Sequence, residues 1–200
     1  MGMIPEHWKT KKLKFIIEYI NGYAFDSSIF SDNGDVPVFR IGDINGETIS
    51  FENVVYVNRL DKLQAFETKE NDILLAMSGA TVGKLGFCTG EKGYINQRVG
   101  IIRAKNSRFI FYALKTNSFI EYIINNSLGS AQPNISAKGV ENFIIAVPND
   151  DEINNIVMFL DRKISVINNL INKIESQISL LQERKQIIIN EVVTGKVKVS

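Results

Sequence analysis

Apolar residues recur with a heptad spacing near the end of the chain, from Ile153 to Val192. The steps between them alternate between four and three residues, and a single polar residue, Lys185, occupies one position of the series. A period of about 3.5 residues keeps one seam of a helix facing a partner helix along its whole length. The series runs through Ile153, Val157, Leu160, Ile164, Ile167, Ile171, Ile174, Ile178, Leu181, Lys185, Ile188 and Val192. The pattern therefore predicts one long helix, roughly 60 Å in length at ~1.5 Å per residue.

The flanks of this segment carry the signals of a helix start and a helix end. Pro148 and Asn149 come first and residues 150–152 are acidic, which offers a cap and negative charge at the positive end of the helix dipole. Gly195 follows the last apolar position, where glycine is typical of a helix C-terminus. The long helix is therefore expected to begin close to Asn149 and to end before Gly195.

Two interpretations of the long helix are open. In the first, its seam packs against the globular part of the same chain, and in the second it pairs with another long helix as a coiled coil. We prefer the second, because a helix of this length exceeds the width of a small domain and the sequence predicts only one such helix. The residues of the expected dimer interface are Val157, Leu160, Ile164, Ile167, Ile171, Ile174, Ile178, Leu181, Lys185 and Ile188.

The polar position in the seam indicates the direction of pairing. In a parallel homodimer Lys185 would face its own copy, which places two like charges across the seam. In an antiparallel pair that crosses between Ile171 and Ile174, Lys185 faces Leu160 instead. Flanking residues then form exposed pairs of opposite sign, worth only ~0–1 kcal/mol each. These pairs are Arg184 with Asp161 and Glu183 with Arg162.

The segment before the long helix alternates short apolar runs with turn residues, which is typical of short strands. Strands are expected over residues 36–41, 51–57, 73–77, 82–87, 99–104 and 143–147. One helix is expected over residues 109–126 and a short one over 60–66, while residues 13–20 fit either a helix or a strand. We therefore expect an α+β fold, with a mixed β-sheet domain over residues 1–148 and one long coiled-coil helix with a tail over residues 149–200.

Composition narrows the function classes. The net charge is +1, which excludes an obviously basic nucleic-acid coat but leaves room for a local basic face. Cys88 is the only cysteine, so no internal disulfide can form, which fits a reducing cytosol. His7 is the only histidine, which argues against a histidine-based zinc site or a Ser-His-Asp triad. No apolar run reaches the ~18 residues of a membrane span and no signal pattern opens the sequence, so we expect a cytoplasmic protein outside the membrane.

Motifs of catalysis are incomplete in this sequence. Residues 78–84 resemble a phosphate loop, but only three residues separate Gly79 from Gly83, and Leu85 stands where Ser or Thr would hold magnesium. Glu67-Thr68-Lys69 fits the acid-x-Lys tripeptide of metal-dependent nucleases. The same tripeptide pattern occurs twice within the predicted long helix, which lowers its weight. The sequence therefore predicts a chain without catalytic, metal-binding or cofactor-binding residues.

Several segments, taken in their order and spacing, resemble one protein family. They are Ile4-Pro5-Glu6-His7-Trp8 with Lys12-Leu13, Pro37 to Ile44, Asn71-Asp72-Ile73-Leu74, Ser78 to Lys84, Asn96-Gln97-Arg98-Val99, Gly129 to Ser136 and Phe143 to Pro148. Together they resemble the specificity (S) subunit of type I restriction–modification systems and cover nearly the whole chain. One departure lies at residues 151–154, where the family usually has Glu-Gln ahead of an Ile.

The resemblance implies a role in sequence-specific recognition of double-stranded DNA. A full-length S subunit has two recognition domains and two long helices, so this chain resembles a half-subunit. The implied partners are modification subunits, which use S-adenosylmethionine, and restriction subunits driven by ATP with Mg²⁺. The chain itself is then expected to bind no cofactor.

Candidate DNA contacts follow from the chemistry of base and phosphate recognition. Arg suits guanine, Asn and Gln suit adenine, and Lys, Ser and Thr suit phosphates. The loop over residues 127–136 and the loop over residues 78–84 are rich in such residues and in glycine. The candidates are Arg40, Ser78, Thr81, Lys84, Arg98, Ser130, Gln132, Asn134 and Lys138.

Two further functions remain possible from the sequence. A protein–protein adaptor would use the heptad helix to join partners, and the near-neutral charge fits that hypothesis. A stand-alone nuclease would use Glu67 and Lys69. Retention on duplex DNA at low salt, lost as salt rises, separates the DNA hypothesis from the adaptor.

Overall fold

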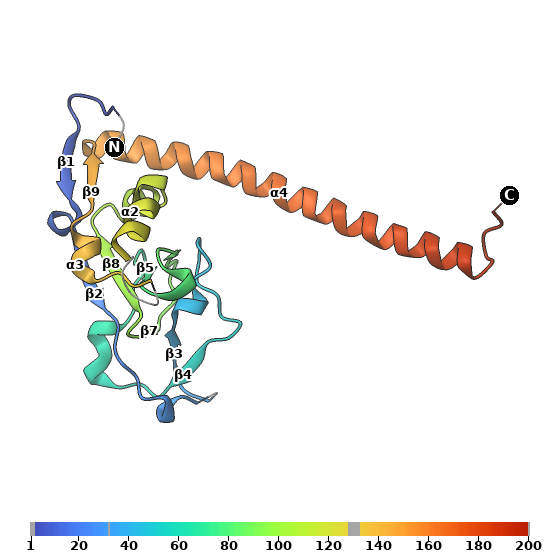
Figure 1. The fold of residues 1–200 in the computed structure, drawn as a ribbon, viewed down its shortest axis with the longest axis horizontal. Helices are drawn as coiled ribbons and strands as arrows, with labels where there is room; N and C mark the ends of the chain where they lie inside the picture. The colour runs from blue at the N-terminus through green and yellow to red at the C-terminus, as the bar shows by residue number, and fades with distance from the viewer. Residues whose placement is uncertain (1–2, 32, 128–132, 200) are drawn as a thin grey trace. The chain divides into compact units, whose positions relative to one another are not determined.

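The computed structural model describes residues 3–31, 33–127 and 133–199 (Figure 1). The chain divides into two compact units, an N-terminal unit up to Ile153 and a C-terminal unit from Asn154 onward. The N-terminal unit contains the strands and the shorter helices, and the C-terminal unit contains most of the long helix α4 (Asp150–Val193).

A four-stranded antiparallel sheet forms the centre of the N-terminal unit. Its strand order is β2-β8-β5-β6, with β2 (Ile17–Asn21), β8 (Val99–Ala104), β5 (Ile73–Ala76) and β6 (Leu85–Phe87). All four residues of β5 are buried, as the unbroken apolar run predicted. Residues 13–20, which fitted either a helix or a strand, form both: the 3₁₀ helix η1 (Leu13–Phe15) precedes β2.

The remaining strands of the described residues form two smaller sheets. In one, β3 (Val36–Phe39) pairs antiparallel with β4 (Val55–Val57) and parallel with β7 (Tyr94–Ile95). In the other, β1 (Lys9–Lys12) lies antiparallel beside β9 (Ile144–Val147), as Figure 1 shows. The sheets together with the long helix confirm the expected α+β class.

Some predicted strands are shorter in the structure, for local reasons. β4 begins only at Val55, because the Ser50 hydroxyl accepts a hydrogen bond from the Glu52 amide and the Asn53 carbonyl is bound by Arg40. β6 begins only at Leu85, since the chain turns at Gly83 with a positive φ of 85°. Side-chain bonds and the turn thus replace ladder pairing.

The prediction of one helix over residues 109–126 is wrong. The structure has two helices, α1 (Ser107–Leu114) and α2 (Asn117–Ser127). The Thr116 hydroxyl donates to the Ala113 carbonyl at 2.8 Å, and the Thr116 carbonyl accepts from the Phe119 amide at 3.0 Å. Thr, Asn and Ser compete for backbone groups in this way, and they fill residues 116–118. The short helix expected over residues 60–66 is confirmed as the 3₁₀ helix η4 (Asp61–Phe66).

A further helix, α3 (Ala137–Glu141), was not predicted from the sequence. Its N-cap is Ser136, whose hydroxyl accepts from the Gly139 amide at 3.1 Å. The helix has too few residues for a helical apolar spacing to be visible in the sequence. It packs beside β2 and η1, which places it next to the site described below.

The buried core joins the sheets. One cluster includes Phe39 of β3, Leu74 of β5 and Ile101 of β8. A second cluster lies around Val38 of β3 and Tyr94 of β7. The apolar faces of β3 and β7 therefore hold the small mixed sheet against the central sheet.

The long helix α4 has 44 residues and starts at a capping box. The Asn149 side chain accepts from the Glu152 amide at 2.9 Å, and the Glu152 carboxylate accepts from the Asn149 amide at 3.3 Å. The chain leaves the helix at Gly195, whose φ is 73°. Both predicted limits of the helix are therefore confirmed.

The first turn of α4 also makes side-chain contacts within the N-terminal unit. Nε2 of His7 lies 2.7 Å from the Glu152 carboxylate, and Lys105 lies 2.7 Å from Asp150. The hydrogen bond from His7 lowers the pKa of Glu152, and the hydrogen bond from Lys105 lowers the pKa of Asp150. These contacts add to the cap at the helix start.

The heptad seam is exposed along most of α4. The apolar seam positions from Ile167 to Ile188 have exposed fractions between 45% and 64%. Across the described ranges, no helix combines the length and the apolar character that crossing a membrane requires.

Candidate nucleic-acid interface

A groove of about 500 Å³ forms in the N-terminal unit between the end of β2, the turn before β8 and the segment that enters α3. Three of the predicted DNA-contacting residues, Arg98, Asn134 and Lys138, line this groove. The other lining residues are Asn21, Met77, Gln97, Ile135, Ser136 and Ala137. The fold thus brings together polar residues that lie far apart in the sequence.

The end of β5 holds the walls of the groove in place. The backbone of Met77, just after β5, bonds to both walls: its amide donates to the Arg98 carbonyl and its carbonyl accepts from the Ile135 amide, each at 2.9 Å. Ser78 and Asn134 then form an isolated antiparallel bridge. Because β5 is fully buried, it anchors both walls to the core.

A tight turn presents the Arg98 side of the groove. The Val99 amide donates to the Asn96 carbonyl at 2.8 Å, which closes the turn with Gln97 and Arg98 at its tip. Gly22 packs directly against this turn. A Cβ at Gly22 would lie 2.0 Å from the Asn96 carbonyl oxygen, so only glycine allows this approach.

The polar side chains of the groove are free to meet a ligand. Gln97, Arg98, Asn134 and Lys138 are exposed. Within the part of the chain that the structure describes, their side chains form no hydrogen bond or ion pair. Arg presents two donors that match guanine, the amides match adenine, and Lys suits a phosphate. The groove therefore offers both base-reading and phosphate-binding chemistry.

The charge of the groove is positive. Arg98 and Lys138 line it, and its described lining residues include no carboxylate.

Other predicted residues lie near the groove without lining it. Ser78 is only 5% exposed, and its carbonyl accepts from the Thr81 hydroxyl at 3.3 Å. Thr81 ends the 3₁₀ helix η5 (Gly79–Thr81) and is half-buried. Ser78 thus contributes the backbone bridge that positions Asn134, and little of the residue itself is exposed.

Two predicted residues lie elsewhere in the N-terminal unit. Lys84 lines a separate hollow of about 240 Å³ beside Lys115 and Ile120. The Arg40 guanidinium donates to the Asn53 carbonyl, so it supports a loop and is not presented to the groove. The remaining two predicted residues, Ser130 and Gln132, lie outside the described residues.

Sequence reasoning missed Gln97 and Asn21 as groove residues. Gln97 lies beside the candidate Arg98 and has the amide that reads adenine, so the residue type itself was the available signal. Asn21 also has an amide side chain, but it lies in none of the loops that were considered for DNA contact. Its place in the groove depends on the pairing of β2 with β8, where Asn21 lies opposite Gly100.

The sequence also matches a known family. Residues 5–180 match the family model described as "Type I restriction modification DNA specificity domain". The match covers most of the chain, so the chain belongs to this family.

Individual relatives agree with that assignment. The chain is 30% identical over 213 residues to the "Type I restriction enzyme MjaVIII specificity subunit" of Methanocaldococcus jannaschii, covering 100% of this chain and 48% of that protein. It is 24% identical to the "Type I restriction enzyme EcoBI specificity subunit" of Escherichia coli, covering 96% and 40%. The chain thus spans about half the length of the relatives it matches.

Solved structures share the fold. The crystal structure of the HsdS subunit from Thermoanaerobacter tengcongensis superposes with a TM-score of 0.64 at 20% identity, over 84% of this chain and 40% of that one. A chain from the study "Structural basis underlying complex assembly and conformational transition of the type I R-M system" gives a TM-score of 0.75 at 17% identity, over 95% and 46%. The fold of mixed sheets with a long C-terminal helix therefore recurs in these proteins.

Proposed function

We propose that this chain is a non-catalytic recognition subunit that gives a type I restriction–modification complex its DNA sequence specificity. The observation that carries the proposal is the positively charged groove, in which Gln97, Arg98 and Asn134 present exposed side chains. The names of the relatives support the same role. In this proposal the chain acts in the cytoplasm, and S-adenosylmethionine, ATP and Mg²⁺ are bound by partner subunits.

The geometry gives less support to the nuclease alternative. The Glu67 carboxylate is held by Arg59 at 3.0 Å, and the Glu67 carbonyl accepts from Arg103 at 2.8 Å. The described residues also include no group of three or more His, Cys, Asp or Glu side chains placed to hold a metal ion. Glu67 and Lys69 therefore serve the fold in this proposal.

The exposed seam of α4 supports the proposed antiparallel homodimer. Pairing through the seam covers apolar side chains that are otherwise half-exposed, from Ile167 to Ile188. A second stripe, on a different face of α4 from the seam, is also exposed, at Phe159, Val166, Leu180 and Ile187. A two-helix coiled coil covers only the seam, so we assign this second stripe to the modification subunits.

Replacing the groove residues is expected to change base preference. The double variant Arg98→Ala with Asn134→Ala should lose ~1–3 kcal/mol of specific binding for each bidentate base contact removed. Fluorescence anisotropy with the target duplex and with mismatched duplexes measures this loss. Lys92→Ala, an exposed basic residue outside the groove, is the control. Unchanged affinity and unchanged base preference in the double variant would show that the groove takes no part in DNA recognition.

The target is expected to be an interrupted palindrome, since a two-fold dimer presents the same recognition surface to both DNA strands. Sequencing of methylated bases measures this in cells that carry the partner subunits and this chain as the only specificity protein. The expected result is two inverted half-sites with a fixed spacer. An asymmetric methylated motif would contradict the homodimer, and absence of any methylated motif in cells with active partners would contradict the function.

A further inference from the structure

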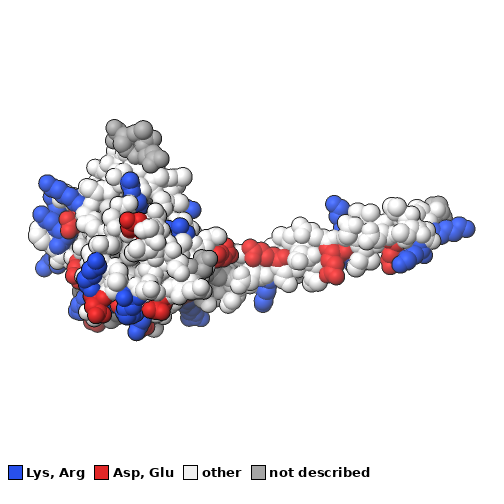
Figure 2. Space-filling view, turned by 90° about the horizontal axis from the view of Figure 1, so that it is seen from below, with Lys and Arg blue, Asp and Glu red and all other residues white. Residues whose placement is uncertain are grey.

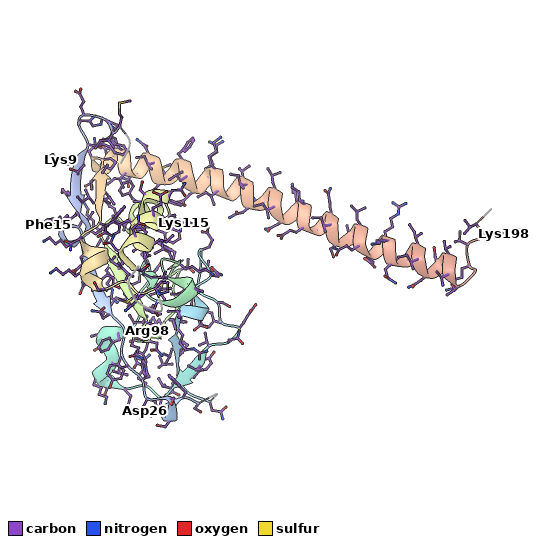
Figure 3. All side chains as sticks on the ribbon, in the orientation of Figure 1. Lys9, Phe15, Asp26, Arg98, Lys115 and Lys198 are labelled. Carbon is purple, nitrogen blue, oxygen red and sulfur yellow. The ribbon has the colours of Figure 1, made fainter. Side chains whose placement is uncertain are left out.

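A second positively charged surface lies away from the groove, along β1 and η1. It consists of Lys9, Lys11, Lys12 and Lys14, and we call it the basic edge. All four lysines are exposed. Figure 2 shows Lys and Arg side chains gathered at the left end of the N-terminal unit, and Figure 3 labels Lys9 and Phe15 on that side.

The charges of the basic edge are not neutralised. Among the described residues, none of its four ammonium groups forms a salt bridge. Other basic side chains in the same unit are paired, for example Arg103 with Asp72 and Lys105 with Asp150. The local contact of Lys14 is with the ring of Phe15, 4.9 Å from its centroid, and Phe15 is itself 71% exposed. A chain of net charge +1 thus concentrates positive charge on one edge.

The backbone holds this edge in an extended form. Among the described residues β1 pairs only with β9, so no strand lies along its other side. Leu13 is fully buried, and its amide donates to the Phe143 carbonyl at 2.9 Å. Lys9 to Lys12 spans roughly 10 Å at ~3.3 Å per residue, about the rise of three base pairs of DNA, and Lys14 follows in η1. Successive side chains of a strand point to opposite faces, so Lys9 and Lys11 lie on one face of β1 and Lys12 on the other, and their flexible stems can reach phosphates from both sides of the open edge.

The basic edge and the groove are connected by one continuous part of the fold. β1, η1 and β2 follow one another, and β2 ends at Asn21 in the groove. Helix α3 packs beside both η1 and β2, and its Lys138 lines the groove. β2 has five residues, roughly 16 Å at ~3.3 Å per residue. One duplex seated in the groove can therefore reach the basic edge within about one helical turn of DNA.

We propose that the basic edge binds the phosphate backbone of the duplex beside the recognised bases, without reading sequence. This inference rests on the proposed function, because it assumes that the groove receives DNA. The lysines give charge complementarity to phosphates but none of the bidentate geometry that selects a base. The basic edge therefore contributes affinity and register on the duplex, and the groove contributes specificity.

The test is the salt dependence of DNA binding by the full chain. The triple variant Lys9→Gln, Lys12→Gln and Lys14→Gln is compared with wild type on a mixed-sequence duplex of about 40 base pairs at several salt concentrations. Each phosphate that the variant no longer neutralises lowers the slope of log affinity against log salt by about 0.9, so the expected reduction is about 2–3. Affinity should fall alike for all sequences. Lys11 is left unchanged because it lines a hollow beside Ile16 and Phe109.

A matched control removes the same net charge elsewhere. Lys62, Lys69 and Lys92 are exposed lysines of the same unit, and their triple Gln variant should keep the wild-type slope. A wild-type slope in the basic-edge variant overturns the inference and leaves the proposed function standing. If that variant keeps the slope but no longer binds the modification subunit, the edge binds protein. If it keeps the slope but self-associates, the lysines only block strand pairing. A wild-type chain that does not bind the duplex at low salt removes the proposed function as well.

Discussion

Ile174→Asp is expected to abolish self-association of this chain. Ile174 lies at the middle of the heptad seam and is 54% exposed in the single chain. Pairing of two helices there would bury a carboxylate without a partner in each copy, which costs several kcal/mol. Light scattering at micromolar concentration should show a monomer, while circular dichroism should show that the N-terminal unit still folds.

The control for this variant adds the same charge to the same turn of α4. Ser176 lies outside the seam, so Ser176→Asp should leave the dimer intact. A dimeric Ile174→Asp variant would show that the seam does not form the interface, and it would also exclude the antiparallel arrangement.

Gly22→Ala is expected to give the largest loss of stability in the N-terminal unit. The new Cβ would lie 2.0 Å from the Asn96 carbonyl oxygen and 2.8 Å from the Val99 carbonyl oxygen, and backbone atoms cannot rotate away. Overpacking of this kind costs ~1–3 kcal/mol and more where nothing yields. At roughly 2–4 °C for each kcal/mol, thermal unfolding should show a clear fall in Tm.

The same variant should also weaken DNA binding at temperatures where it remains folded, because Asn96 closes the turn that carries Gln97 and Arg98. Gly42→Ala is the matched control, since nothing lies within 4 Å of a Cβ at Gly42. Equal Tm values for the two variants would show that the turn moves aside at little cost.

Strong local patterns explain what the sequence predicted correctly. The buried strand β5 is an unbroken apolar run, and α4 combines a long heptad series with a cap at Asn149 and a stop at Gly195. Each of these signals lies within one continuous stretch of the sequence and does not depend on a distant segment. The sequence predicted α1 and α2 as one helix, because the apolar spacing continues across Thr116. The break between them depends on hydrogen bonds of the Thr116 side chain and carbonyl.

Strand β1 could not be predicted for the opposite reason. Its residues, Lys9–Lys12, are all exposed and show no apolar alternation, so the strand forms only through pairing with β9. The groove likewise depends on contacts between distant segments. Arg98 and Asn134 were identified by residue type, but the backbone of Met77 is what joins their segments, and nothing in the local sequence of Met77 indicates that role.

The pairing of β1 with β9 has a consequence for how such a chain can change its target. Because Lys9 lies opposite Val147, the first and last strands of the N-terminal unit are neighbours in one small sheet. The residues between these two strands, including those of the groove, form one continuous segment whose two ends lie side by side. Domains whose two ends lie close together can be inserted into another chain or exchanged between related chains with little disturbance of the fold. Under the proposed function, replacement of residues 13–143 by the equivalent segment of a relative is therefore expected to transfer a new base preference, while the cap at Asn149 and the helix that follows stay unaltered.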